Sequence, residues 1–322
     1  MSKFIRYLFF TALIIMPFMS YAENNATKKI LYIDSYYEGY EWSDGVVNGV
    51  RNVLAKKMPT ATLKTIYMDS NRHSELDLIQ AVVAKIRDEI TNFQPDVVIA
   101  CDDSAMKNVV MPYYKNTSLP IVFCGINWDA SIYGLPYQNT TGMVEVSLIP
   151  QIVAHLEQYA KGKKLGILAE ETISSQKNID QYKKMFHIQY DKVYKVSTIG
   201  EWKEKFLQLQ DEVDMILMTN MSNVRGWNET EVADFVYQNI KIPLGTDVTW
   251  NIPYSLVAIG KIPEEQGEWA AETALKILAG EKPSEIPITQ NKQGQLHINL
   301  KLGNKLKIAF NPALLKVAEL FR

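Results

Sequence analysis

The sequence lacks the short motifs that mark the common enzyme classes. Its 322 residues contain no Gly-x-Ser-x-Gly elbow, no Walker A loop, no Gly-x-Gly-x-x-Gly fingerprint and no Cys-x-x-Cys pair. Histidine is also scarce: four are scattered along the chain, and this pattern predicts no zinc site. We therefore expect a protein without catalytic activity, cofactor or bound metal ion.

A strong charge of either sign is absent as well. Lys and Arg number 34 against 36 Asp and Glu, the net charge is −2, and no extended basic block occurs. Because nucleic acid binds mainly through basic surfaces, no nucleic-acid partner is expected. Hydrophobic residues make up 47% of the chain and charged residues 22%, which indicates a folded protein whose length suits two domains.

Cysteine is nearly absent, since only Cys101 and Cys124 occur, each at the end of a predicted strand. An oxidising compartment would permit a disulfide between them, but the ends of parallel strands rarely meet disulfide geometry. Two buried thiols are the favoured interpretation, and the alternative of a bridge stays open.

Long hydrophobic runs are missing, because no stretch reaches the roughly 18 apolar residues of a membrane-spanning helix. A shorter apolar segment, Tyr7 to Phe18, follows Lys3 and Arg6 and precedes the small-x-small site that ends at Ala22. This pattern predicts a signal peptide over residues 1–22, cleaved after Ala22. Position 23 is not cysteine, so a lipid anchor there is not expected. We expect a freely diffusing periplasmic protein.

Strands and helices alternate along the rest of the chain, which predicts an α/β fold of parallel sheets with right-handed crossovers. The alternation occurs in two rounds, separated near residues 141–145. We expect an N-terminal lobe over 23–142, completed by about 252–285, and a C-terminal lobe over 143–251, completed by about 286–322.

The loops at strand ends are the expected binding site, because open α/β sheets bind ligands at the carboxyl ends of their strands. Four tryptophans, Trp42, Trp128, Trp227 and Trp250, fall in such loops and predict stacking walls for a flat or apolar ligand group. Asp102 and Asp103 follow a strand and precede a helix. They are interpreted first as helix caps, although Asp103 could face the cleft.

Several ordered segments resemble the tryptophan/tyrosine-type ABC transporter substrate-binding proteins, over nearly the whole chain after the signal peptide. The resemblance is carried by residues 121–127, 141–145, 267–280, 286–288 and the tail from 298 to 318. It implies a two-lobed type I periplasmic-binding-protein fold that closes over a small ligand. By position it also implies ligand contacts at Asp103, Ser104, Ala105, Asn127, Ser174, Ser175 and Asn220. One departure is Asp103-Ser104, where family members often carry Thr-Pro.

The sequence thus predicts a periplasmic solute-binding protein that captures a small organic solute, with an amino acid as one candidate, for an ABC permease. Amide and hydroxyl groups would form hydrogen bonds to polar atoms of the ligand, and Asp103 or Asp247 would form an ion pair with its amino group. Aromatic rings would flank its apolar part. The candidate ligand-binding residues are Ser35, Tyr36, Trp42, Asp103, Ser104, Asn127, Trp128, Ser175, Asn220, Asp247 and Trp250.

Two alternatives remain. The stretch from Ser35 to Trp42 resembles extracytoplasmic sensor domains, so the partner could be a membrane histidine kinase or cyclase instead of a permease. A more remote alternative is a periplasmic hydrolase that uses Asp102, Asp103 and Glu171.

Overall fold

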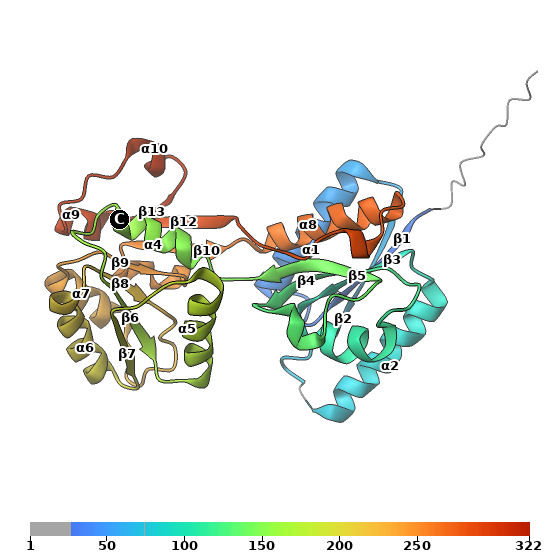
Figure 1. The fold of residues 1–322 in the computed structure, drawn as a ribbon, viewed down its shortest axis with the longest axis horizontal. Helices are drawn as coiled ribbons and strands as arrows, with labels where there is room; N and C mark the ends of the chain where they lie inside the picture. The colour runs from blue at the N-terminus through green and yellow to red at the C-terminus, as the bar shows by residue number, and fades with distance from the viewer. Residues whose placement is uncertain (1–26, 74) are drawn as a thin grey trace, which may run out of the picture.

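A computed structural model describes residues 27–73 and 75–322. These residues form two α/β lobes, each built on its own sheet and flanked by helices (Figure 1). The predicted signal peptide lies outside the described residues. Within the described ranges, no helix is both long and apolar enough to cross a membrane.

The first lobe holds a six-stranded, all-parallel sheet in the order β11-β5-β4-β3-β1-β2. Its central strands are continuous apolar runs because helices cover both faces. The strands are β1 (Lys29–Asp34), β2 (Thr62–Tyr67), β3 (Val97–Cys101), β4 (Ile121–Asn127), β5 (Thr140–Glu145) and β11 (Thr289–Gln290). The helical elements are α1 (Glu41–Lys57), α2 (Leu76–Phe93), α3 (Asp102–Ala105), η1 (Met106–Tyr114), η2 (Ala130–Tyr133), α8 (Pro263–Leu278) and η4 (Pro283–Glu285).

The second lobe holds a seven-stranded sheet in the order β13-β12-β10-β9-β8-β6-β7. Its pairings are parallel except for that of β10 with β12. The strands are β6 (Leu165–Glu170), β7 (Lys192–Val196), β8 (Met215–Met218), β9 (Leu244–Thr246), β10 (Val257–Lys261), β12 (Gly294–Asn299) and β13 (Glu319–Phe321). The helical elements are α4 (Ile149–Glu157), α5 (Ile173–Phe186), α6 (Ile199–Glu212), α7 (Glu229–Asn239), η3 (Thr249–Tyr254), α9 (Leu300–Lys305) and α10 (Pro312–Leu315).

Helices α1 and α8, far apart in the sequence, pack side by side on one face of the first sheet (Figure 1). Their close approach depends on glycine, since a Cβ at Gly267 would lie 1.8 Å from the carbonyl oxygen of Val46. The apolar faces of both helices join β1 and β3 in one core cluster. The first lobe is therefore completed by a late segment of the chain.

The chain crosses between the lobes after Glu145, after Lys261 and between β11 and β12. The sequence assigns 252–285 to the first lobe, whereas β10 pairs with β9 and β12 in the second sheet. The first lobe is instead completed by residues 263–290, which form α8, η4 and β11, so β11 lies in the first lobe although 286–322 is predicted to complete the second. A short apolar strand such as β10 fits either core, and only its strand partners decide where it lies.

Two local features differ from or refine the sequence expectations. A proline inside a helix removes a backbone hydrogen bond and usually ends the helix, but the helical segment after β3 continues past Pro112 in π form to Tyr114. Cys101 and Cys124 are register partners on neighbouring strands β3 and β4, and both are buried, free thiols.

Candidate ligand-binding cleft

A cleft of about 630 Å³ lies between the lobes, where the carboxyl ends of strands from both sheets meet. Its walls carry rings, carboxylates, hydroxyls and amides. The residues from the first lobe are Tyr36, Tyr40, Glu41, Trp42, Asn127, Trp128, Glu145 and Pro263. Those from the second lobe are Ser147, Glu170, Ser174, Ser175, Asn178, Tyr182, Thr219, Asn220, Asp247, Val248, Thr249, Trp250, Gly260 and Lys261.

The loop after β1 forms an aromatic wall of the cleft. Buried Asp34 fixes the loop, because its carboxylate accepts hydrogen bonds from the N–H of Tyr36 at 2.9 Å and from the hydroxyl of Ser43 at 2.7 Å. The rings of Tyr36 and Tyr40 stack with their centroids 4.6 Å apart. A rigid pair of rings therefore faces the cleft.

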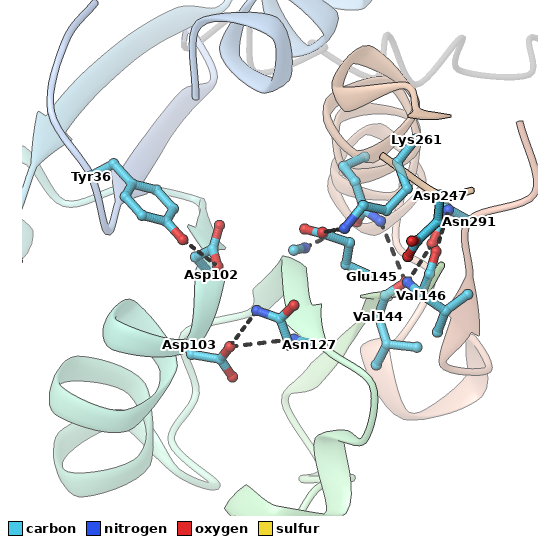
Figure 2. A network of polar contacts seen from close by, with 12 residues as sticks. Tyr36, Asp102, Asp103, Asn127, Val144, Glu145, Val146, Asp247, Lys261 and Asn291 are labelled. Carbon is cyan, nitrogen blue, oxygen red and sulfur yellow. Dashed lines mark hydrogen bonds and ion pairs between the residues drawn. The ribbon is translucent and has the colours of Figure 1, made fainter. Parts of the chain in front are cut away.

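Asn127, the last residue of β4, presents its amide at the cleft beside Asp103 (Figure 2). The carboxylate of Asp103 accepts hydrogen bonds from Asn127 Nδ2 at 2.8 Å and from the Tyr133 hydroxyl at 2.7 Å. These bonds tie β4 to η2. Asp103 therefore holds the Asn127 side chain in position through this hydrogen bond, and it is not among the residues that line the cleft.

Ser35 and Ser104, both predicted to contact ligand, also lie outside the cleft lining. The hydroxyl of Ser35 is buried, donates to the carbonyl of Cys101 at 2.7 Å and accepts from the N–H of Ala105 at 2.9 Å. The hydroxyl of Ser104 accepts from Asn108 at 2.9 Å, within the same helical segment. Both side chains satisfy local backbone and amide groups, which is why they do not reach the cleft.

Asp102 and Trp128, which follow β3 and β4, have left-handed backbones with φ of 73° and 64°. This conformation is rare for residues other than glycine and concentrates at functional sites. The Asp102 carboxyl is buried 3.5 Å from the Tyr36 hydroxyl, and its Oδ2 atom has no hydrogen-bond partner (Figure 2). Burial, followed by the nearby Glu145 carboxylate, raises the pKa of Asp102 well above its ordinary value.

An ion pair between Glu145 and Lys261 joins the two lobes at the cleft (Figure 2). Each residue ends a strand just before the chain crosses, so the pair bridges two of the crossing segments. Burial raises the pKa of Glu145 even though Lys261 opposes the rise. This pair is not predicted from the sequence, where a charged residue at the end of each of two buried strands is the one signal for it.

The wall of the second lobe is built from the N-terminus of α5 and the ends of β6 and β9. The hydroxyl of Thr172 caps α5 by accepting from the N–H of Ser175 at 3.1 Å. Further along α5, Tyr182 donates its hydroxyl to Asp247 at 3.2 Å. Glu170 accepts from the N–H and the amide of Asn223. These bonds hold two carboxylates of the wall in place.

Two further contacts join the lobes beside the cleft. The rings of Trp128 and Tyr182 meet edge to face with centroids 5.4 Å apart. Next to them, Lys184 pairs with Asp129 at 3.0 Å. Hydrogen bonds from Ser131, followed by the one from Lys184, lower the pKa of Asp129 to about 2.

The structure brings most of the predicted site residues to one cleft. Those that line it are Tyr36, Trp42, Asn127, Trp128, Ser175, Asn220, Asp247 and Trp250, whereas Ser35, Asp103 and Ser104 do not. Trp227, considered for its loop position, packs edge to face on Trp202 and Tyr254 inside the second lobe. None of the three carboxylates of the hydrolase alternative, Asp102, Asp103 and Glu171, lines the cleft.

Two α/β lobes that are joined by three crossings and enclose a polar, aromatic cleft define a protein of the type I periplasmic-binding-protein fold. Residues 40–321 match the family described as ABC transporter substrate binding protein, and the chain belongs to this family.

Solved structures of low sequence identity share the fold. An open, ligand-free substrate binding protein with adhesive properties, CD0873 from Clostridium difficile, has a TM-score of 0.71 at 16% identity, covering 92% of this chain and 99% of that one. The ABC domain of Streptococcus pneumonia in complex with L-Trp has a TM-score of 0.55 at 17% identity, covering 92% and 100%. A periplasmic ribose ABC transporter protein from Conexibacter woesei has a TM-score of 0.55 at 13% identity, covering 91% and 98%.

A curated protein also matches a short piece of the chain. It is the non-reducing polyketide synthase stbA of Stachybotrys bisbyi, 34% identical over 67 residues, which are 21% of this chain. The chain spans about 3% of that protein's length.

Proposed function

We propose that the protein captures a small organic solute between its lobes and delivers it to an ABC permease in the membrane. The cleft of about 630 Å³ is the observation that carries this proposal, because it has the size of small-molecule sites. Its walls come from both lobes, so a ligand held by both favours one relative position of the lobes over others. A membrane partner that distinguishes these positions would recognise the loaded protein.

The contacts that we assign to the ligand follow from the side chains of the cleft. In this assignment, Asn127, Ser175 and Asn220 form hydrogen bonds to polar groups of the ligand. Asp247 forms an ion pair with its amino group. The rings of Tyr36, Trp42, Trp128 and Trp250 flank an apolar part. An amino acid is one ligand class that provides both groups.

A second candidate function keeps the same ligand site and changes the partner. The loop from Ser35 to Trp42 resembles extracytoplasmic sensor domains and forms one wall of the cleft through Tyr36 and Trp42. In that case the partner is a membrane histidine kinase or cyclase. Deleting the gene would then abolish a signalling response to the ligand, whereas a transport role predicts loss of uptake of the labelled ligand.

Native mass spectrometry of the protein purified from the periplasm tests the proposed capture. We expect a small molecule to be released on denaturation, chemically unchanged, and to raise the melting temperature when it is added back. A protein that is always empty, and that no fraction of a metabolite extract stabilises, would contradict solute capture. Recovery of a cleaved product would instead favour the hydrolase.

We also propose that the chain is exported and that its mature form begins at Glu23. The small residues before this position suit signal peptidase. The intact mass of the periplasmic protein should therefore correspond to residues 23–322. A mass that includes residues 1–22 would refute the proposal.

A further inference from the structure

The charges that line the cleft are strongly one-sided. Four carboxylates face it, those of Glu41, Glu145, Glu170 and Asp247. Among the described residues of the lining, Lys261 is the single cation. Lys261 already pairs with Glu145 and lies beside Asp247 (Figure 2). An incoming ligand therefore meets an excess of negative charge.

Among the described residues of the lining, no cation is left free to pair with a ligand carboxylate, because Lys261 is already paired with Glu145. Asn127 already donates to Asp103 at 2.8 Å, and Asn220 donates to Ser222 at 2.8 Å. The remaining donors are neutral amides and hydroxyls. Neutral donors stabilise a bound carboxylate less than a cation does, so they offset less of the repulsion from the nearby carboxylates of the cleft.

The aromatic side chains suit a cation as well as a flat group. The ammonium of Lys261 lies 5.4 Å from the ring centroid of Trp42, so one ring of the wall already contacts a positive charge. The stacked rings of Tyr36 and Tyr40 lie on the same wall. Rings of this kind attract ligand ammonium groups through their negative faces.

We infer that the ligand is an organic cation, an amine or a quaternary ammonium, attached to a flat apolar group and carrying no carboxylate. The inference rests on the proposed function of this same cleft and narrows its ligand class. Asp247 is the assigned partner of the positive charge, because its side chain is only half-buried and its carboxylate accepts a hydrogen bond from the Tyr182 hydroxyl, which leaves acceptor capacity for a ligand. An amino acid would bring its own carboxylate into the negative cleft.

Isothermal titration with two matched pairs, tryptamine against tryptophan and tyramine against tyrosine, tests the inference on the mature protein. Each pair differs only by the carboxylate. We expect at least one amine to bind, and to bind at least about tenfold more tightly than its amino acid, with affinity falling as salt is added. Equal or tighter binding of the amino acids would overturn the inference and leave solute capture intact. Absence of binding by all four compounds would also overturn it.

Variants locate the charge that the amine meets. Asp247→Asn, which keeps the shape and an acceptor for Tyr182, should weaken amine binding about tenfold. The matched control is Glu171→Gln, an exposed carboxylate outside the cleft lining that pairs with Lys195. It should retain the parental affinity. Parental affinity in Asp247→Asn overturns the assignment of Asp247. If that variant does not fold, Glu41→Gln at the exposed rim replaces it, with a smaller loss expected.

The proposal that the protein captures a solute is tested separately from the charge of that solute. The copurified molecule identified by mass spectrometry can be any solute, charged or not. A copurified acid or neutral sugar therefore supports capture and refutes the cationic ligand, whereas a copurified amine supports both.

Discussion

Single residues decide whether the two walls of the cleft act on one ligand. Asn127 and Asn220 face the cleft from different lobes. We predict that Asn127→Ala and Asn220→Ala each weaken binding of the copurified ligand by about 1–3 kcal/mol, the cost of one buried hydrogen bond. The ligand-free melting temperature should change little, because neither side chain is buried and the hydrogen bonds that they donate, to Asp103 and Ser222, are exposed to solvent. Calorimetric titration and ligand-free melts provide the measurement. Parental affinity in either variant removes that residue from the site.

The ion pair of Glu145 with Lys261 gives a second prediction, for stability. Lys261→Met leaves Glu145 buried without its partner, and we expect a loss of about 3 kcal/mol in the free energy of unfolding near neutral pH. Burial raises the pKa of Glu145 in the folded protein. Between the pKa of Glu145 in the unfolded state and its higher pKa in the folded state, the folded protein keeps a proton that the unfolded chain releases. The contribution of Glu145 to stability therefore falls as the pH rises through this range.

The loss of stability in Lys261→Met should accordingly shrink as the pH is lowered through the raised pKa of Glu145. Urea unfolding at several pH values measures it. The control is the double variant Glu145→Gln with Lys261→Met, which should recover most of the stability and lose the pH dependence. A deficit that is constant with pH would exclude an unpaired Glu145 as its cause.

Residues at strand ends could be placed from the sequence, and residues that depend on distant partners could not. Asn127 and Trp128 follow directly from the position of β4, since polar loops after parallel strands meet at one edge. Asp103 and Ser35 are equally close to strand ends but turn to neighbouring groups instead. The pairing of Glu145 with Lys261 requires two crossing segments to meet, which local spacing does not encode.

At the scale of elements, the contact of α1 with α8 is the feature most sensitive to one added carbon. Gly267→Ala would place a Cβ 1.8 Å from the carbonyl oxygen of Val46, so the helices must separate. We predict a loss of about 1–3 kcal/mol in the free energy of unfolding. Gly200→Ala is the control, because its Cβ would meet only the Thr198 hydroxyl at 4.0 Å. Urea unfolding should show Gly200→Ala to be neutral or slightly stabilising; equal losses in both variants would refute the packing argument.

The alternation of strands and helices was predictable because fully buried strands and amphipathic helices differ in length and periodicity. The expected α/β fold is confirmed by the two sheets and the structural neighbours. The short elements were not predictable. β11 has two residues and β13 has three, too few for any periodicity, and the lobe to which β10 belongs depends on pairing alone.

At the scale of the whole molecule, three crossings and a few lateral contacts connect the lobes. Trp128 contacts Tyr182, and Asp129 pairs with Lys184, across the two lobes. Trp250, by contrast, lies at the rim of the second lobe with 62% of its surface exposed. A large exposed ring at the edge of a binding cleft gains burial when the lobes approach each other.

We therefore predict that ligand binding brings the lobes together, by hinge closure about the crossings. Small-angle scattering of the mature protein should show a smaller radius of gyration with saturating copurified ligand. Tryptophan emission should change at the same time, and Trp250→Phe should remove part of that change because its ring leaves water on closure. Trp269→Phe is the control, since Trp269 packs against the core of the first lobe away from the cleft. An unchanged radius would contradict closure, and an emission change that survives in Trp250→Phe while disappearing in Trp269→Phe would place the moving surface elsewhere.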